Sequence, residues 1–560
     1  MTLVKLAHFA KISHRSRGRS ADRGVRFSVR TPLTTPIRAL LLVFSSAVCV
    51  TQACADDPFQ PGLRWRATPN AALPAVPKSA TFAMDANFVF TISNGPFTRL
   101  QLFSAFQDGL VPAPLASFTP TNTTGALAVA SADSIDALFA LTQVLAPDST
   151  HRATLVSRYS AIAAAANGNL SALWTFDSGI RANGPARLGC DAAGTRVFVA
   201  NWNGPTPEVR FDVLDATTGA SLANTMIFAA ALNEMNVAAD GTRIALGLGR
   251  SVWIVDGNAN LRHQEIVPLA TSGLSLSGDG AVAAIGGTRV RVLIETATTY
   301  VPAFEVSGNL GEVATRVALS RDARTLAIGW WNATNGVDAR FEIIDVATQT
   351  RLFQRQLTGV VGGLQNAPEI VRVTPNGERA ALGAWGDGTN APEILLYDRA
   401  TNSIRLEADT LGSVFALDLD RQGTKLSVGV KGAHANQFAA SGEFRLHDTG
   451  ESDTTVLKAP RPASTMDVAA KKTGASVVAF LSGPRALFPS TIPGVPGVLA
   501  LDRSQLILVR RPADATGRAD LTVVIPNDPL LIGTYRHLQS AFLINGSWTL
   551  GASVVDVLVH

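Results

Sequence analysis

The chain has 560 residues, of which 46% are hydrophobic, so it can bury a sizeable core, and a wholly disordered chain is excluded. Charged residues make up 16%, below the usual share of about 25%. We find no local basic patch in the sequence, and we therefore expect no nucleic-acid partner.

Residues 1–55 have the three parts of a secretory signal peptide. Nine of the 48 Lys and Arg residues lie there, against a single acidic residue, so the rest of the chain is mildly acidic. An apolar run at 39–50 follows, too short for a bilayer span of about 20 residues, and small residues follow at Ala53 and Ala55. We expect cleavage between Ala55 and Asp56, export to the periplasm or the exterior, and no transmembrane segment in the mature chain.

The three cysteines are Cys49, Cys54 and Cys190. Acylation of Cys54, as in a lipoprotein, is an alternative to simple cleavage, although the residues before it match that pattern poorly. Cleavage leaves Cys190 alone, so we expect no internal disulfide and no cysteine metal cluster.

From residue 188 onward a pattern recurs: an alternating strand, a turn of Asp-Gly or Asn-Gly type, and a second apolar strand. The copies begin at Leu188, Met235, Leu274, Val317, Val371 and Ala416. Their shared turn position falls at Gly194, Gly241, Gly280, Ala323, Gly377 and Gly423. Such turns need positive φ, which predicts tight hairpins.

A third strand follows each hairpin after a variable loop. These strands are expected at 209–214, 251–255, 289–293, 340–344, 393–397 and 443–447. A fourth strand has room before the next copy. Four antiparallel strands in about 40–50 residues are the blade of a β-propeller.

These units resemble the WD40-like blades, of the YVTN and PQQ-like kind, in secreted bacterial propellers. The shared phrase is a turn such as Ser-Gly-Asp-Gly at 277–280 and a closing Asp-Ala-Thr-Thr-Gly at 215–219. The resemblance covers about residues 80–480 and implies the fold rather than a specific activity. Most of the units lack the closing Trp of quinone-enzyme blades, and the sequence has no adjacent cysteine pair, so we expect no cofactor.

Two weaker units, at 82–103 and 126–141, precede the six clear ones, and a partial unit at 466–480 follows them. The sequence therefore predicts an all-β protein with a seven- or eight-bladed β-propeller over 56–483. The Pro- and Gly-rich segment 484–497 is predicted to be a linker.

Residues 498–560 are predicted to form a small β-sandwich-like module, with strands near 505–509, 520–524, 540–544 and 554–559. An extra sheet docked against the propeller is the alternative. A terminal strand would also fit recognition by an export or surface-attachment system.

The loops between second and third strands carry the candidate ligand-binding residues. They are Asn201, Trp202, Asn203, Trp330, Trp331, Asn332, Trp385, Asp387, Asn390, His434 and Asn436. Indole faces beside amides suit a sugar ring or an aromatic ligand. The alternative is that the tryptophans pack between blades.

We identify no catalytic residue and no metal site in the sequence. His434 is the best acid–base candidate, and Asp387 stands in a loop with too few carboxylates for calcium. The sequence favours a monomeric, non-catalytic module that binds a protein or a glycan through one face. The alternative is a propeller hydrolase or lyase, of lactonase or polysaccharide lyase type, which titratable side chains from three or more blades at the central channel would favour.

Overall fold

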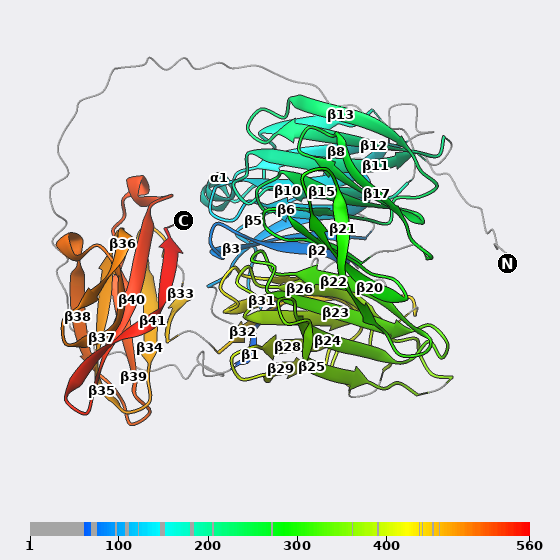
Figure 1. Cartoon of the computed structure of the whole chain (residues 1–560). Helices are drawn as coiled ribbons and strands as arrows, with labels where there is room; N and C mark the ends of the chain where they lie inside the picture. Colours follow the sequence, from blue (N-terminus) through cyan, green and yellow to red (C-terminus); the bar gives the residue numbers. More distant parts are fainter. Residues whose placement is uncertain are drawn as a thin grey trace, which may run out of the picture. The chain divides into compact units, whose positions relative to one another are not determined.

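The computed structural model describes residues 61–68, 75–95, 98–106, 111–120, 123–145, 152–179, 184–203, 206–269, 273–360, 362–388, 391–435, 437–439, 441–450, 453–458 and 460–559 (Figure 1). They belong to one compact unit, 55–560. The expected signal peptide, its cleavage site and Cys54 lie outside the described residues.

The described residues form 41 β-strands, one α-helix, α1 (Ala161–Asn167), and two short 3-10 helices (Arg503–Gln505 and Pro529–Leu531). The predicted all-β class is therefore confirmed. None of the helices in this part of the chain is long and apolar enough to cross a membrane.

Strands β1–β32 form eight antiparallel sheets of four strands, which we number 1 to 8 in chain order. Sheet 1 contains β2 (Val76–Ala83), β3 (Phe88–Asn94), β4 (Arg99–Ser104) and β5 (Ala116–Phe118). Sheet 2 contains β6 (Thr123–Ser131), β7 (Leu138–Leu145), β8 (Arg152–Tyr159) and β9 (Trp174–Asp177). Sheet 3 contains β10 (Ala186–Cys190), β11 (Arg196–Asn203), β12 (Glu208–Asp215) and β13 (Ser221–Phe228). Sheet 4 contains β14 (Glu234–Val237), β15 (Arg243–Leu248), β16 (Ser251–Asp256) and β17 (Leu261–Ile266).

The remaining four sheets repeat this order of strands. Sheet 5 contains β18 (Leu274–Leu276), β19 (Val282–Ile285), β20 (Arg289–Glu295) and β21 (Tyr300–Ser307). Sheet 6 contains β22 (Glu312–Leu319), β23 (Thr325–Asn332), β24 (Ala339–Asp345) and β25 (Thr350–Leu357). Sheet 7 contains β26 (Pro368–Val373), β27 (Arg379–Ala384), β28 (Ile394–Asp398) and β29 (Ser403–Ala408). Sheet 8 contains β30 (Val414–Leu419), β31 (Lys425–Lys431), β32 (Gly442–Thr449) and β1 (Pro61–Ala67).

The six predicted hairpin turns have the backbone conformation that their sequences indicate. Five are glycines with φ between 64° and 71°, and Ala323 takes the same position at φ 56°. Glycine reaches this left-handed region freely, whereas alanine is strained there. The Asp-Gly pattern therefore located the hairpins correctly.

We expect Ala323→Gly to raise the free energy of unfolding by about 0.5–1 kcal/mol, because glycine relieves the strain at positive φ. Urea denaturation of both proteins measures the difference. The matched control is Gly377→Ala, which should destabilise, since the new Cβ would lie 2.6 Å from Thr325 Oγ1. A loss of stability in Ala323→Gly would contradict this account of the turn.

Neighbouring sheets pack face to face through apolar side chains. The first strand of each sheet contacts the first strand of the next, and β2 of sheet 1 also contacts β30 of sheet 8. Each of these eight pairs of sheets shares a cluster of buried apolar residues. A single four-stranded sheet cannot cover its own apolar faces, so each depends on two neighbours.

Backbone hydrogen bonds also join the hairpin turns of successive sheets. The amide of one turn donates to a carbonyl of the next turn along the chain. The bonds are Asp85 N to Asp133 O (2.8 Å), Asp133 N to Ala192 O (3.1 Å), Ala192 N to Ala239 O (2.8 Å), Asp240 N to Gly278 O (3.0 Å), Gly278 N to Arg321 O (2.8 Å) and Asp322 N to Pro375 O (3.2 Å). The first seven sheets are therefore linked at one end by the main chain itself.

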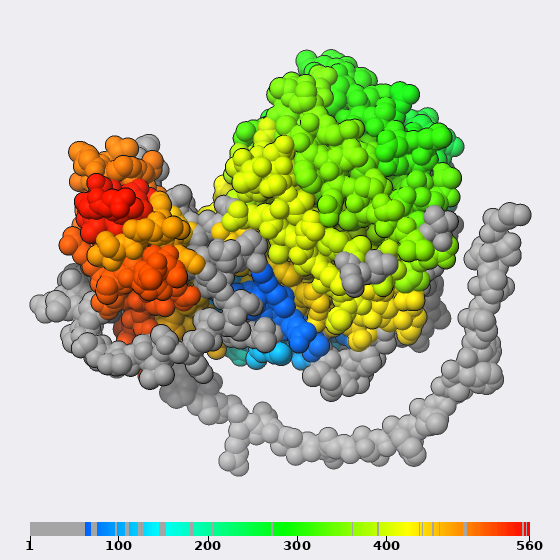
Figure 2. All heavy atoms as spheres, turned by 90° about the horizontal axis from the view of Figure 1, so that it is seen from below, coloured from blue at the N-terminus to red at the C-terminus, as the bar shows by residue number. Residues whose placement is uncertain are grey.

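Sheet 8 combines the two ends of this region. Its outer strand β1 comes from the N-terminal side and pairs antiparallel with β32, for example Arg66 with Arg445. Figure 2 shows blue N-terminal residues lying against the yellow residues of sheet 8. The pairing fixes the beginning of the described chain to a strand almost 400 residues later.

The C-terminal strands form three further sheets, with orders β33-β34-β39, β38-β35-β40-β41 and β36-β37. Their bounds are β33 (Thr454–Lys458), β34 (Thr465–Lys471), β35 (Ala475–Gly483), β36 (Arg485–Ile492), β37 (Val495–Leu501), β38 (Ile507–Pro512), β39 (Arg518–Val524), β40 (Tyr535–Ile544) and β41 (Ser547–Leu558). We call residues 453–559 the C-terminal module. It contacts sheet 1, where Leu558 N donates to Asn87 Oδ1 at 2.9 Å.

Two expected boundaries need correction. The partial unit at 466–480 does not join the eight sheets, because β34 pairs with β39 and β35 pairs with β38 and β40. The expected linker at 484–497 is largely the hairpin β36-β37, which turns at Gly494 (φ 74°). Leu499 and Leu501, directly after the expected linker, are fully buried in the module's core.

Candidate functional site

The strands of each sheet alternate in direction, which defines two faces. In sheets 1 to 7, one end carries the start of the first strand, the end of the fourth strand and the loop between the second and third strands. We call this end the loop face. The opposite end, which carries the hydrogen-bonded hairpin turns, is the turn face.

A cavity of about 590 Å³ is lined by the first strands of all eight sheets or by residues that adjoin them. At the end near the loop face its lining includes Lys78, Arg187, Glu234, Glu369 and Phe415. Near the turn face it includes the backbone of the hydrogen-bonded turns. Because strands from every sheet contribute, no local motif in the sequence marks this cavity.

Four arginines in this lining each face a carboxylate. The pairs are Arg187 with Glu234 (3.8 Å), Arg316 with Glu369 (3.4 Å), Arg372 with Asp418 (3.9 Å) and Arg321 with Asp133 (2.9 Å). Partly exposed pairs of this kind contribute at most about 1 kcal/mol each to stability. Their main effect is to fix the charged side chains in place along the wall.

The pair of Arg321 and Asp133 joins sheets that are not neighbours. Arg321 follows β22 of sheet 6, and Asp133 follows β6 of sheet 2. Two guanidinium nitrogens reach the carboxylate, and these hydrogen bonds are the main reason that the pKa of Arg321 is raised. This pair therefore crosses the cavity beside the turn face.

The candidate residues of sheet 3 lie on or beside β11 and serve largely internal contacts. Asn201 is fully buried and donates to Ser178 Oγ at 2.9 Å. Trp202 is half-buried, and its Nε1 donates to Ala229 O at 3.2 Å. Asn203 donates to Thr206 Oγ1. The Nδ2 atom of Asn201 is therefore used in an internal contact, and the role of Asn201 in ligand binding stays a prediction.

In sheet 6 the two adjacent tryptophans have different environments. Trp330 is fully buried, and its Nε1 donates to Glu342 Oε2 at 2.7 Å. Trp331 is half-buried, with a long hydrogen bond of 3.4 Å to Gly336 O. Asn332 accepts from the amides of the turn that follows it. Trp330 therefore packs between sheets 5 and 6, which agrees with the packing alternative that the sequence left open, whereas Trp331 stays a candidate.

The loops of sheets 7 and 8 bring several predicted residues together. Trp385 is half-buried and donates from Nε1 to Glu369 Oε2 at 2.7 Å, which ties this loop to the cavity wall. Asp387 is buried in the same loop, and a hydrogen bond of 3.5 Å links Ala435 N, next to His434, to Trp385 O. Asn390 and Asn436 lie outside the described residues.

Glu393, which sequence analysis did not select, lies beneath these two loops. It is fully buried, and its Oε1 lies 3.6 Å from His434 Nδ1. Gly386, at φ 72°, packs so closely that a Cβ there would clash with both side chains. Burial, which opposes the charged form, raises the pKa of Glu393 to about 8 despite the hydrogen bond from Thr410 N.

The raised pKa of Glu393 gives a pH-dependent prediction. Its pKa is about 8 in the folded protein and 4.5 in an ordinary environment, so its contribution to stability is present below pH 4.5 and is lost as the pH rises through 8. Glu393→Gln removes that loss. We expect the variant to gain stability over wild type as urea denaturation is moved from pH 5 to pH 8, while an unchanged difference across this range would contradict the buried, neutral carboxyl.

Large apolar side chains are exposed on the loop face of six successive sheets. They end a fourth strand or stand in the loops, and Phe438 and Leu310 are 92% and 100% exposed. The set is Phe228, Ile266, Leu310, Val360, Leu411 and Phe438. Leu173 and Leu261 are also exposed, at the turn face, but the loop-face set contains the two most exposed side chains of this kind. Exposed apolar groups of this kind are found on surfaces that bind another molecule.

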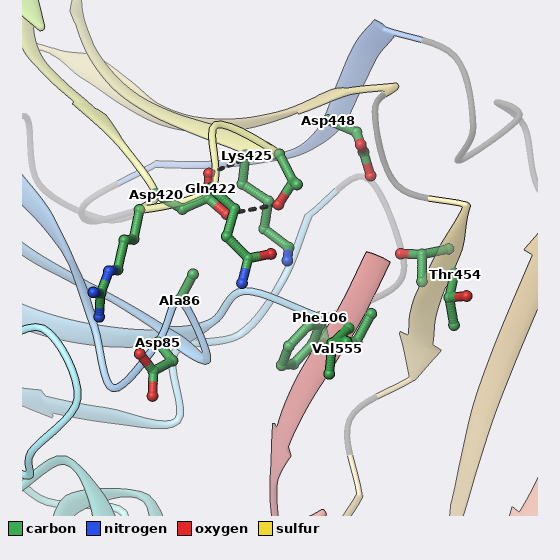
Figure 3. A pocket seen from close by; sticks show the side chains of 13 residues that line it. Asp85, Ala86, Phe106, Asp420, Gln422, Lys425, Asp448, Thr454 and Val555 are labelled. Atoms are coloured by element: carbon green, nitrogen blue, oxygen red, sulfur yellow. Dashed lines mark hydrogen bonds between the residues drawn. The ribbon is translucent and has the colours of Figure 1, made fainter. Parts of the chain in front are cut away.

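A second, smaller cavity of about 40 Å³ lies where the turns of sheets 1 and 8 meet the C-terminal module (Figure 3). Figure 3 shows Lys425 between Asp420 and Asp448, with Phe106 and Val555 from two other segments. The Lys425 ammonium lies 4.7 Å from the Phe106 ring centroid, and burial lowers its pKa. The space holds little more than water, so it is not a candidate for an organic ligand.

No family model and no curated protein matches the chain.

Proposed function

We propose that the protein is an exported, non-catalytic eight-bladed β-propeller that binds a partner protein through its loop face. Export is supported by the basic, apolar and small-residue pattern of residues 1–55. The expectation of a monomer stays a prediction.

Closure into eight blades is supported by contacts between sheets. First strands touch in the sequence of sheets 1 to 8, and sheet 8 touches sheet 1 again. The shared apolar cluster of that last interface includes Trp65, Phe103 and Phe444. Completion of the last sheet by β1 would prevent the ring from opening at this interface.

The observation that carries the binding proposal is the set of exposed apolar side chains on the loop face. Water favours their burial, at about 25 cal/mol for each Å² of apolar surface covered. They lie on the same face as the end of the cavity that Lys78, Arg187 and Glu234 line. A protein partner can cover the apolar groups and place a polar segment at the cavity.

Site-specific photo-crosslinking in the cells that make the protein tests this proposal. A benzophenone amino acid is placed at Phe438 on the loop face or, as the matched control, at Leu173 on the turn face, which is 58% exposed. We expect a discrete covalent adduct from position 438 and none from 173. Adducts only from position 173, or from neither, would overturn the proposal.

A glycan partner remains the other form of the binding proposal, since Trp331 and Trp385 are half-buried on the loop face. A glycan-array screen of the mature chain, with Trp331→Ala and Trp385→Ala, separates the two. The protein-partner proposal predicts no glycan whose binding either substitution abolishes. A glycan that binds wild type but neither variant would replace the protein-partner proposal with the glycan-partner proposal.

An enzyme is the second candidate, because titratable side chains from six sheets converge on the cavity. This is the arrangement that the hydrolase or lyase alternative requires. Turnover of a panel of lactones and oligouronates, measured with wild type and Glu369→Gln, tests it. Activity that the variant loses would establish the enzyme, and the binding proposal predicts no turnover above the blank.

A further inference from the structure

Two lysines from neighbouring sheets converge on one aromatic ring near the loop face. Lys78 Nζ, on β2 of sheet 1, lies 5.1 Å from the centroid of the Phe415 ring, and Lys431 Nζ, on β31 of sheet 8, lies at the same distance. Lys78 and Phe415 both line the 590 Å³ cavity. We call Lys78, Phe415 and Lys431 the lysine cluster.

The lysine cluster differs from every other cationic group of the cavity wall. Each of the four arginines there has a carboxylate within 4 Å. Among the residues that the structure describes, no carboxylate forms an ion pair with Lys78 or Lys431. A positive charge at the edge of the cavity is therefore left without a counter-charge from the protein.

Lys431 makes the electrostatic imbalance larger. Its side chain is buried, with Nζ donating to the carbonyls of Ala435 (2.5 Å) and Gln437 (3.0 Å), which hold it rigidly. Burial and, secondly, the charge of Lys78 lower its pKa. Two like charges held together at a partly buried site attract an anion. The anion reduces the repulsion between the two ammonium groups and offsets the cost of their desolvation.

We propose that the lysine cluster holds a carboxylate of an acidic peptide segment that the partner inserts into the cavity from the loop face. Lys78 makes the direct ion pair, Lys431 adds its field from behind, and the Phe415 ring packs against the methylene groups of a glutamate or aspartate. This inference rests on the proposed function and names the chemistry of the partner.

The surroundings favour a peptide over other carriers of a carboxylate. A protein partner can cover the exposed apolar side chains of Leu411 and Phe438, which belong to the loops before and within sheet 8. An acidic glycan would leave those groups in water. The half-buried cluster also suits a single compact carboxylate better than a phosphate chain, which needs a longer basic track.

The test is calorimetric titration of the mature chain 56–560 with a capped tetraglutamate peptide. The comparison probes are capped tetraglutamine, inorganic phosphate and trigalacturonate. We expect tetraglutamate to bind, more weakly at high ionic strength, and tetraglutamine and phosphate not to bind. Tighter binding of trigalacturonate or of phosphate would overturn the assignment to a peptide.

Lys78→Met keeps the length of the side chain and removes its charge, while Lys431 is too buried for a clean substitution. We expect Lys78→Met to weaken tetraglutamate binding by about tenfold or more. The matched control is Lys458→Met, at an exposed lysine of β33, which should leave the affinity unchanged. Thermal denaturation shows whether wild type and Lys78→Met are both folded. Equal affinity in the two folded proteins would overturn the inference.

The two proposals fail in distinguishable ways. If tetraglutamate does not bind but the adduct from position 438 forms and survives Lys78→Met, the lysine cluster is not the recognition site, while the loop-face proposal stands. If position 438 gives no adduct but tetraglutamate binds through Lys78, the acidic-ligand site stands and the loop-face protein interface falls.

Discussion

Replacing Trp65 with alanine is expected to lower the free energy of unfolding by about 3–5 kcal/mol. Trp65 lies on β1 and is fully buried, with its ring centroid 5.2 Å from that of Phe103. Its cluster joins sheet 8 to sheet 1. The substitution removes a large apolar side chain and leaves a cavity at the interface where the last sheet meets the first.

Urea denaturation followed by circular dichroism measures this effect. Trp548→Ala is the control, because Trp548 is only partly buried in the C-terminal module, and it should cost clearly less. A loss below about 1 kcal/mol for Trp65→Ala would mean that β1 is not an integral part of the eight sheets.

Arg340→Met is expected to destabilise the protein by a similar amount, about 3–5 kcal/mol. Arg340 is 1% exposed and lies between two carboxylates, donating to Glu312 at 3.1 Å and to Glu342 at 2.8 Å. Its guanidinium also lies 5.0 Å from the ring of Trp330. Removing the arginine leaves buried negative charge without its main counter-charge.

The exposed pair of Arg289 and Glu305 supplies the matched control for Arg340. These side chains are 63% and 39% exposed, so Arg289→Met should cost less than about 1 kcal/mol. The double variant Arg340→Met with Glu312→Leu should recover part of the loss, because it also removes one of the stranded charges. Equal losses for Arg340→Met and Arg289→Met would contradict the buried network.

The repeat predicted most of the fold because its information is local. A turn of Asp-Gly type between two apolar strands specifies a hairpin within about a dozen residues, and the positive φ at Gly241 and Gly280 confirms it. The end of the repeat region was wrong because β34 pairs with β39, some 50 residues later. Nothing within residues 466–480 shows where that strand finds its partner.

The site was predicted less completely, for two physical reasons. Side chains alternate between faces along a strand, so Trp330 and Trp331 have opposite environments, and the pattern could not tell which one is buried. The cavity wall takes one or a few residues from each sheet, and Lys78 belongs to a weak repeat. A charged residue near the start of several first strands, as at Arg187, Glu234 and Glu369, was the signal available.

The account depends most on the proposal that β1 closes the ring of sheets, since the cavity and the loop face both need it. An engineered disulfide tests it directly: Arg66→Cys and Arg445→Cys, paired across β1 and β32, are introduced into a Cys190→Ser background. We predict spontaneous formation of a 66–445 disulfide in the folded protein, detected by mass spectrometry without reductant, because directly opposed strand residues lie within disulfide reach. Two freely reactive thiols in a folded protein would contradict closure by β1.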